Sequence, residues 1–195
     1  GGGSADGAAV LHALNRLYQT DLDLAELQEV GLKVGADVPF CLAGGTCLVQ
    51  GIGEKVTALP PFPQVQLVLV KPETGVSTAE VYRRLSPAAH GSTSTARLTA
   101  LLEEGQGAAV LAGTFHNALE MVTEALVPEV SLWKERLLAQ GAHCALMSGS
   151  GPTVFGLFTE EGQARSFQAA YRGEAQIFTA GLEYSGVEEM NGGDR

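Results

Sequence analysis

The sequence contains few basic side chains and no long apolar run, and these absences argue against several classes of protein. Its 195 residues carry 12 Lys and Arg side chains against 22 Asp and Glu, a net charge of −10. No cluster of Lys or Arg is visible, so binding to nucleic acid or to an anionic membrane surface is disfavoured. The apolar stretches are too short to span a bilayer. We therefore expect a cytoplasmic protein with no nucleic-acid or membrane partner.

Cysteine is also scarce, and the three that are present match no metal or redox motif. Cys41, Cys47 and Cys144 are odd in number and lack CxxC spacing. We expect them to be small buried side chains in a reducing compartment. The four histidines are scattered and do not have the spacing of metal ligands. The sequence therefore predicts no metal site built from these residue types.

The arrangement of periodic segments predicts an α+β chain with two domains. The prolines at 60, 61 and 63 cannot continue a helix or a central strand, so we place domains at 1–62 and 63–185 and a polar tail at 186–195. Asp23 and Glu26 have the spacing of a capping box. Expected helices lie at 8–18, 24–30, 36–42, 77–85, 95–104, 114–126, 129–140 and 159–171, and expected strands at 46–49, 55–59, 65–70, 144–147, 154–158 and 176–179.

The glycine run that opens the chain has two readings. Gly1, Gly2 and Gly3 followed by Ser4 match a flexible linker, or a loop that holds a phosphate at a helix start. The helix that follows favours the second reading, with Ser4 expected as its N-cap and Asp6 in its first turn. Its apolar stripe runs through Val10, Leu14 and Leu17.

A second glycine segment, at 148–151, lies between two predicted strands. It is compatible with a simple tight hairpin, because glycine adopts positive φ at little cost. Neither glycine segment has the Lys-Ser/Thr of a Walker A loop, and no strand of this chain precedes residue 1 as a Rossmann fingerprint requires.

Two further residues could carry chemistry. Asp37 is a carboxylate in an apolar setting, so it is either the N-cap of the short helix that follows or a reactive base. Tyr82 lies on a predicted helix face, where a tyrosine is either a core residue or a flat platform for a ligand. The local sequence leaves both pairs of alternatives open.

Taken together, five segments in order resemble the 4-diphosphocytidyl-2-C-methyl-D-erythritol kinases, a family within the GHMP kinase superfamily. The segments are residues 1–6, 35–39, 51–54, 71–82 and 146–155. Each is a weak signal alone, but five in order are specific. The Gly-Ala-Asp-Val-Pro sequence at 35–39 and the segment at 71–82 favour this family over other members of the superfamily.

The resemblance implies a GHMP kinase two-domain fold. The first domain would be the remnant of a ribosomal-S5-like kinase domain, and the second a complete ferredoxin-like α/β domain. The implied activity is ATP-dependent phosphorylation of the 2-hydroxyl of 4-diphosphocytidyl-2-C-methyl-D-erythritol in the non-mevalonate isoprenoid pathway. ATP and Mg²⁺ are the implied cofactors. The implied partners are ATP and the cytidyl-diphosphate substrate, and we expect a monomer or a weak homodimer.

The resemblance also assigns roles to residues of this chain. Asp37 matches the catalytic aspartate that takes the proton from the substrate hydroxyl, and Tyr82 lies near an aromatic that stacks on cytosine. The ATP-phosphate loop would comprise Gly1, Gly2, Gly3, Ser4 and Ala5. A glycine turn that packs beside the nucleotide loop would comprise Ser148, Gly149, Ser150, Gly151 and Thr153.

Departures from the family pattern leave alternatives to the implied kinase activity. The family has an N-terminal segment with a catalytic lysine, which this sequence does not contain. Any targeting signal would also precede residue 1. We expect the 195-residue chain to lack kinase activity by itself and to leave apolar faces near 10–17 and 46–49 uncovered. A kinase for another small alcohol, such as homoserine or mevalonate, is the other alternative. Ala118, within the segment at 117–120, replaces an acid common in relatives, which weakens any role for this segment.

Overall fold

The computed structural model describes residues 1–86 and 94–187, and the chain divides into two compact units. The first unit combines Gly1–Pro61 with Glu183–Arg195, and the second is Phe62–Leu182. Residues 87–93, and residues 188–195 of the expected tail, lie outside the described residues.

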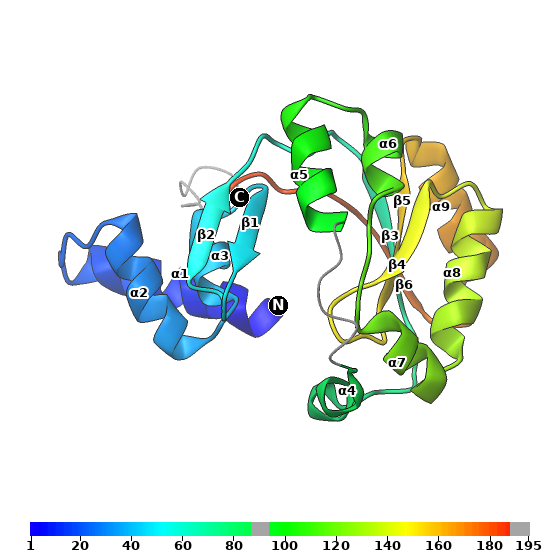
Figure 1. Cartoon of the computed structure of the whole chain (residues 1–195), viewed down its shortest axis with the longest axis horizontal. Helices are drawn as coiled ribbons and strands as arrows, with labels where there is room; N and C mark the ends of the chain where they lie inside the picture. Colours follow the sequence, from blue (N-terminus) through cyan, green and yellow to red (C-terminus); the bar gives the residue numbers. More distant parts are fainter. Residues whose placement is uncertain (87–93, 188–195) are drawn as a thin grey trace. The chain divides into compact units, whose positions relative to one another are not determined.

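The first unit contains helices followed by a hairpin (Figure 1). Asp23 and Glu26 form the predicted capping box. Pro39 lies in the first turn of the short third helix, where a proline is tolerated. Ala8, Leu27, Val38 and Leu42 form the core of this unit. Its elements are α1 (Gly2–Leu17), α2 (Leu24–Val34), α3 (Val38–Ala43), β1 (Cys47–Gln50) and β2 (Lys55–Ala58).

Helix α1 differs from its predicted form at its start. The helix begins at Gly2 with Gly1 as N-cap, so the prediction of Ser4 as N-cap and Asp6 in the first turn is wrong. The amide groups of Ser4 and Ala5 donate to the Gly1 carbonyl oxygen at 3.1 and 3.0 Å, which closes the first turn through the glycines.

The predicted apolar stripe of α1 lies largely at the surface. Val10, Leu14 and Leu17 are 56%, 43% and 72% exposed, and Val49 of β1 is 41% exposed. The face expected to be uncovered near 10–17 is therefore exposed in the structure, whereas at 46–49 only Val49 is exposed and Cys47 and Leu48 are half-buried.

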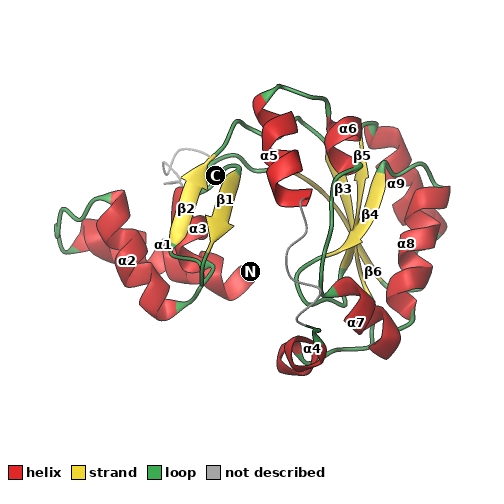
Figure 2. Cartoon of the chain, viewed as in Figure 1, coloured by secondary structure: helices red, strands yellow, loops and turns green. Residues whose placement is uncertain are grey.

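The second unit is built on an antiparallel sheet with strand order β4-β5-β3-β6. Helices α8 and α9 pack on this sheet (Figure 2). Its buried core includes Val68, Val70, Trp133, Leu137 and Phe158. The order is that of a ferredoxin-like sheet. The elements are β3 (Gln66–Lys71), α4 (Thr78–Arg84), α5 (Ser94–Glu103), α6 (Ala108–Ala112), α7 (Glu120–Leu126), α8 (Glu129–Ala139), β4 (Cys144–Met147), β5 (Val154–Phe158), α9 (Glu161–Ala170) and β6 (Gln176–Gly181).

The helix expected at 114–126 is wrong in its first half, because α7 begins only at Glu120. Side chains there satisfy backbone groups that a helix would use. The Thr114 hydroxyl donates to the Leu111 carbonyl oxygen at 2.7 Å, and the Asn117 side-chain oxygen accepts from the Leu119 amide at 2.9 Å. Such local bonds compete with helix formation.

Within the described ranges, no helix has the length and apolar character needed to cross a membrane. The three cysteines are free thiols, as expected, but each is half-buried rather than fully buried. Cys144 is the thiol most changed by its surroundings, because burial raises its pKa to about 11.

The Cys144 thiol should make stability depend on pH in alkaline solution. Its ordinary pKa is 9.0 and its folded value is about 11. The unfolded chain therefore loses the thiol proton first, and the stability contribution present below pH 9.0 is lost as pH rises toward 11. We expect the urea midpoint of the wild type to fall more steeply over this range than that of Cys144→Ala. Parallel curves would contradict the shifted pKa.

Candidate functional site

The start of α1 presents backbone groups to solvent. Gly1, Gly2 and Gly3 are exposed, and a Cβ built on any of them would meet no atom within 4 Å. The first amide groups of a helix lack intrahelical partners and attract anions. The glycines can therefore admit an anionic group close to the backbone, and Ser4 and Ala5 continue the same turn.

Asp37 occupies the N-cap position of α3 but does not act as a cap through its side chain. Its backbone is in the αR region, and the side chain makes no capping hydrogen bond. The residue is exposed, whereas Val38 and Pro39 directly after it are buried. Of the two alternatives left open by the sequence, side-chain capping is absent, so the carboxylate remains available to accept a proton.

Helix α3, which follows Asp37, packs against the first half of α1. A Cβ built on Gly7 of α1 would lie 3.6 Å from Cγ2 of Val38, the residue directly after Asp37. Asp37 also acts on Cys41 of α3: burial raises the pKa of the Cys41 thiol, and the Asp37 carboxylate raises it further. Asp37 is therefore carried close to the first half of α1, within the first unit.

The second glycine segment forms a tight turn between β4 and β5, which agrees with the hairpin reading. The Ser148 amide donates to the Thr153 carbonyl oxygen at 2.8 Å, and the Gly151 amide donates to the Ser148 carbonyl oxygen at 2.9 Å. Gly149 and Gly151 have φ of +57° and +79°, values that favour glycine. Ser148 and Gly149 are exposed at the tip of this turn, which we call the glycine turn (residues 148–153).

Asn117 holds the glycine turn, a contact that the sequence did not reveal. Its side-chain amide nitrogen donates to the carbonyl oxygens of Met147 and Gly149, each at 2.8 Å. The Thr123 hydroxyl, fully buried on α7, donates to the Ser150 carbonyl oxygen at 3.1 Å. The segment at 117–120 therefore has a structural role through Asn117, although Ala118 lacks the acid common in relatives.

Glu120 supports the same turn from α7. Its carboxylate accepts from the Met147 amide at 2.9 Å and pairs with Lys134 at 2.9 Å. Lys134 also pairs with Glu124 at 2.8 Å. Burial by itself lowers the pKa of Lys134, but its hydrogen bonds to Glu124 and Glu120 outweigh burial and raise it. A charged network thus anchors the end of β4 that leads into the turn.

Tyr82 is on the surface rather than in the core. It lies on α4 and is 59% exposed, so its ring is accessible to a flat ligand. The Ser77 hydroxyl caps α4 by accepting from the Glu80 amide. The hydroxyl groups of Thr78 and Ser150 lie 2.8 Å apart and form a hydrogen bond. The helix that carries Tyr82 is therefore tied to the glycine turn.

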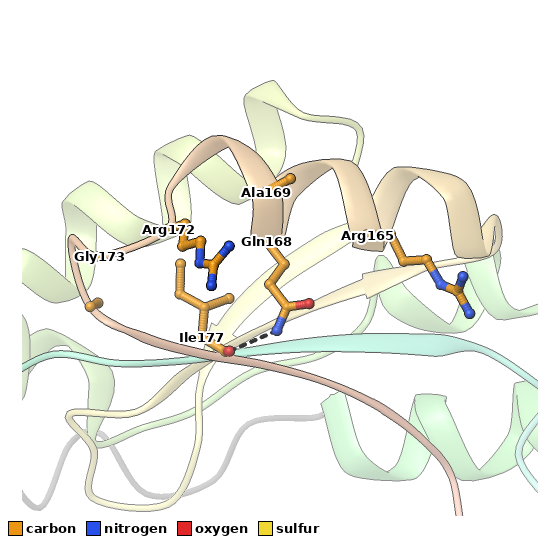
Figure 3. A pocket seen from close by; sticks show the side chains of 7 residues that line it. Arg165, Gln168, Ala169, Arg172, Gly173 and Ile177 are labelled. Carbon is orange, nitrogen blue, oxygen red and sulfur yellow. Dashed lines mark hydrogen bonds between the residues drawn. The ribbon is translucent and has the colours of Figure 1, made fainter.

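Two surface hollows in the second unit are lined by residues other than the predicted site residues. The larger has a volume of about 460 Å³ and lies along α9 and the start of β6. Figure 3 shows Gln168 reaching the Ile177 carbonyl oxygen, which accepts its hydrogen bond at 2.9 Å. Arg165 and Arg172 line this hollow, but both are exposed and Arg165 pairs with Glu161. A second hollow, of about 350 Å³, adjoins Lys71 and Gly173.

Residues 1–86 and 94–187 contain no preformed metal-binding site made of protein side chains. No group of three or more His, Cys, Asp or Glu side chains is arranged there to hold an ion. Mg²⁺ needs few protein ligands when it is bound with phosphate, since it is commonly held by one or two carboxylates and the phosphate oxygens. The residues present are thus compatible with an ion that arrives with a nucleotide.

Removal of the Asn117 side chain should loosen the glycine turn. We expect Asn117→Ala to lower the free energy of unfolding by about 2 kcal/mol, because two carbonyl oxygens and the Leu119 amide lose their partner. The exposed neighbour His116 provides the control, and His116→Ala should change stability by less than about 0.5 kcal/mol. Urea denaturation measures both, and equal midpoints for the two variants would contradict the role of Asn117.

Comparison with known proteins identifies related domains in both units. The model of the GHMP kinase N-terminal domain matches residues 1–45, and the model of the GHMP kinase C-terminal region matches residues 98–175. Together these ranges cover more than half of the chain and include the start of α1, Asp37 and the glycine turn.

Curated relatives and solved structures are similar over most of the chain. A 4-diphosphocytidyl-2-C-methyl-D-erythritol kinase of Pelotomaculum thermopropionicum is 48% identical over 172 residues, which is 88% of this chain and 60% of that relative. A relative of the same name from Acetivibrio thermocellus is 48% identical over 165 residues, 84% of this chain and 58% of the relative. The chain thus spans about 60% of the length of these relatives.

Among solved structures, a 4-(cytidine 5'-diphospho)-2C-methyl-D-erythritol kinase matches with a TM-score of 0.76 and 34% identity, covering 93% of this chain and 65% of that one. A homoserine kinase from Cytophaga hutchinsonii matches with a TM-score of 0.72 and 20% identity, covering 92% and 64%. The second similarity, at this low identity, concerns the fold alone.

Proposed function

Because this chain belongs to the GHMP kinase family, we propose that it functions in ATP-dependent phosphorylation of the 2-hydroxyl of 4-diphosphocytidyl-2-C-methyl-D-erythritol, a step of non-mevalonate isoprenoid biosynthesis. The observation that carries the proposal is 48% identity over 172 residues to a kinase named for this substrate. We also propose a cytoplasmic location, which the three free thiols support.

Asp37 is the proposed general base. A base for this reaction must approach the attacking hydroxyl closely and keep an oxygen free to accept its proton. The exposed, uncapped carboxylate of Asp37 supports this role. The packing of α1 at Gly7 against Val38, the residue directly after Asp37, supports a base that works close to a phosphate-binding helix start.

ATP phosphates are the proposed ligands of the helix start at Gly1, Gly2, Gly3, Ser4 and Ala5. Exposed glycine amides and the helix dipole favour an anion there even though the chain is acidic overall. We propose the glycine turn as a second backbone contact for the nucleotide. Mg²⁺ would be held mainly by the phosphate oxygens of ATP, and its chemistry would be to neutralise phosphate charge.

Tyr82 is the proposed contact for the cytosine ring. Its 59% exposure and the hydrogen bond between Thr78 and Ser150 support an aromatic face that is accessible and held near the glycine turn. Binding of the cytidyl compound is measured for Tyr82→Ala, which removes the ring. Tyr82→Phe, which keeps the flat ring, is its control.

A competition assay tests the choice of substrate. The product of the complete gene is given ATP with equal concentrations of 4-diphosphocytidyl-2-C-methyl-D-erythritol, homoserine and mevalonate. We expect the cytidyl compound to receive nearly all of the transferred phosphate. Preference for either of the other alcohols would contradict the proposal in favour of another GHMP kinase activity.

A further inference from the structure

We propose that Gly53, in the turn between β1 and β2, is a positioning residue that fixes the backbone on which Asp37 is carried. The inference rests on the proposed role of Asp37 as the base. It concerns contacts within the first unit alone, where the β1–β2 hairpin lies beside α3 (Figure 1).

Gly53 makes a contact that only glycine permits. It is buried and has φ of +107°. A Cβ at this position would lie 2.0 Å from the Ala36 carbonyl oxygen and 2.9 Å from the Ala36 carbonyl carbon. Those atoms are backbone and cannot rotate away as a side chain could. The Gly53 backbone therefore packs directly against the residue that precedes Asp37.

The other side of Asp37 is anchored by α3. Val38 is 1% exposed, Pro39 is also buried, and the Pro39 carbonyl oxygen accepts a hydrogen bond from the Gln28 side chain at 3.0 Å. Asp37 thus lies between Ala36, which is held by Gly53, and a helix start that is held by α2. Because its own side chain makes no capping hydrogen bond, the carboxylate depends on this backbone for its position.

Glu54 keeps the turn in the shape that brings Gly53 to Ala36. Its carboxylate accepts from the Ile52 amide at 2.6 Å, and the Gly53 amide donates to the Gln50 carbonyl oxygen at 3.3 Å. Hydrogen bonds from the backbone amides of Glu54 and Ile52 lower the pKa of the Glu54 carboxyl group. The ionised form that makes these bonds is therefore favoured at neutral pH.

The test compares Gly53→Ala with Gly173→Ala. Gly173 also has positive φ, +90°, but a Cβ there would meet no atom within 4 Å. The two variants therefore share the backbone strain, and only the first presses on Ala36. NMR spectra of the 195-residue chain should show shifted amide signals for Ala36 and Asp37 and a shifted Asp37 carboxyl signal in Gly53→Ala, with none of these changes in Gly173→Ala.

A kinetic measurement complements the spectra. In the product of the complete gene, Gly53→Ala should lower kcat by on the order of 10²-fold, the cost of a small misplacement of a catalytic group. The KM for ATP should stay within about twofold of the wild type, because the change acts on the base and not on nucleotide binding. An equal fold loss of kcat in Gly53→Ala and in the control Gly173→Ala would instead indicate general destabilisation of the protein. That result would contradict the inference.

Two outcomes separate this inference from the proposed function. Unchanged Ala36 and Asp37 signals in a folded Gly53→Ala protein would overturn the positioning role, whatever the activity of Asp37 variants. Full activity of Asp37→Asn would overturn the proposed base, whatever the spectra show. If the Gly53→Ala protein does not fold, Glu54→Ala is used as the test variant instead, because removing the Glu54 side chain introduces no steric clash. It should shift the Asp37 carboxyl signal, and an unchanged signal would contradict the inference.

Discussion

Asp37→Asn is expected to reduce kcat for phosphoryl transfer by about 10²–10⁴-fold, the range attributed to a positioned general base. The amide cannot accept the proton of the substrate hydroxyl, although its size and position are nearly those of the carboxylate. Because the Asp37 side chain makes no capping hydrogen bond, the substitution should leave the free energy of unfolding almost unchanged. Loss of activity would then reflect chemistry rather than folding.

The control for this variant is Asp21→Asn in the same unit. Asp21 is exposed and has φ of +53°, a conformation that asparagine also tolerates. We expect wild-type turnover for Asp21→Asn and retained ATP binding by titration calorimetry for both variants. Wild-type turnover of Asp37→Asn in the product of the complete gene would exclude Asp37 as the base.

Gly151→Ala is expected to have the largest effect on the glycine turn. The residue has φ of +79°, and a Cβ there would lie 2.4 Å from the Met147 sulfur and 3.1 Å from the Thr123 methyl carbon. Met147 and Thr123 are 1% and 0% exposed, so neither can move easily. Strain and overpacking together should lower the free energy of unfolding by about 3 kcal/mol.

Gly149→Ala is the matched control at the other positive-φ glycine of this turn. Gly149 has φ of +57°, and no atom lies within 4 Å of a Cβ built there. The Gly149→Ala substitution should therefore lower the free energy of unfolding by only about 1 kcal/mol, through backbone strain. Urea unfolding of both variants measures the difference. Equal decreases in the free energy of unfolding for the two variants would show that crowding by Met147 and Thr123 does not destabilise Gly151→Ala.

Local rules predicted most of the elements, because those rules depend on neighbours in the sequence. The capping box of Asp23 and Glu26 and the cap at Ser77 need only a spacing of three residues. The strands at Gln66–Lys71 and Val154–Phe158 were evident from apolar runs with turn residues around them. The same rules failed at Ser4, because a good capping residue does not stop a helix from starting one turn earlier.

The contacts that shape the candidate site were not predictable in this way. Asn117 binds Met147 and Gly149 across 30 and 32 residues of sequence, and no local pattern reports such a pairing. Gly53 was part of a recognised segment, but its contact with Ala36 follows from the packing of the hairpin against α3. The sequence singled out Asp37 as a candidate base, and that role stays a prediction, whereas the absence of a side-chain capping bond at Asp37 was visible only in the structure.

Analysis of the reaction product is the most direct test of the proposed activity. The product of the complete gene is incubated with ATP and 4-diphosphocytidyl-2-C-methyl-D-erythritol, and the phosphorylated compound is examined by ³¹P NMR and mass spectrometry. The proposed function predicts a new phosphomonoester on the 2-hydroxyl, formed in step with ADP. Formation of ADP without this phosphomonoester, or a phosphate on another hydroxyl, would contradict it.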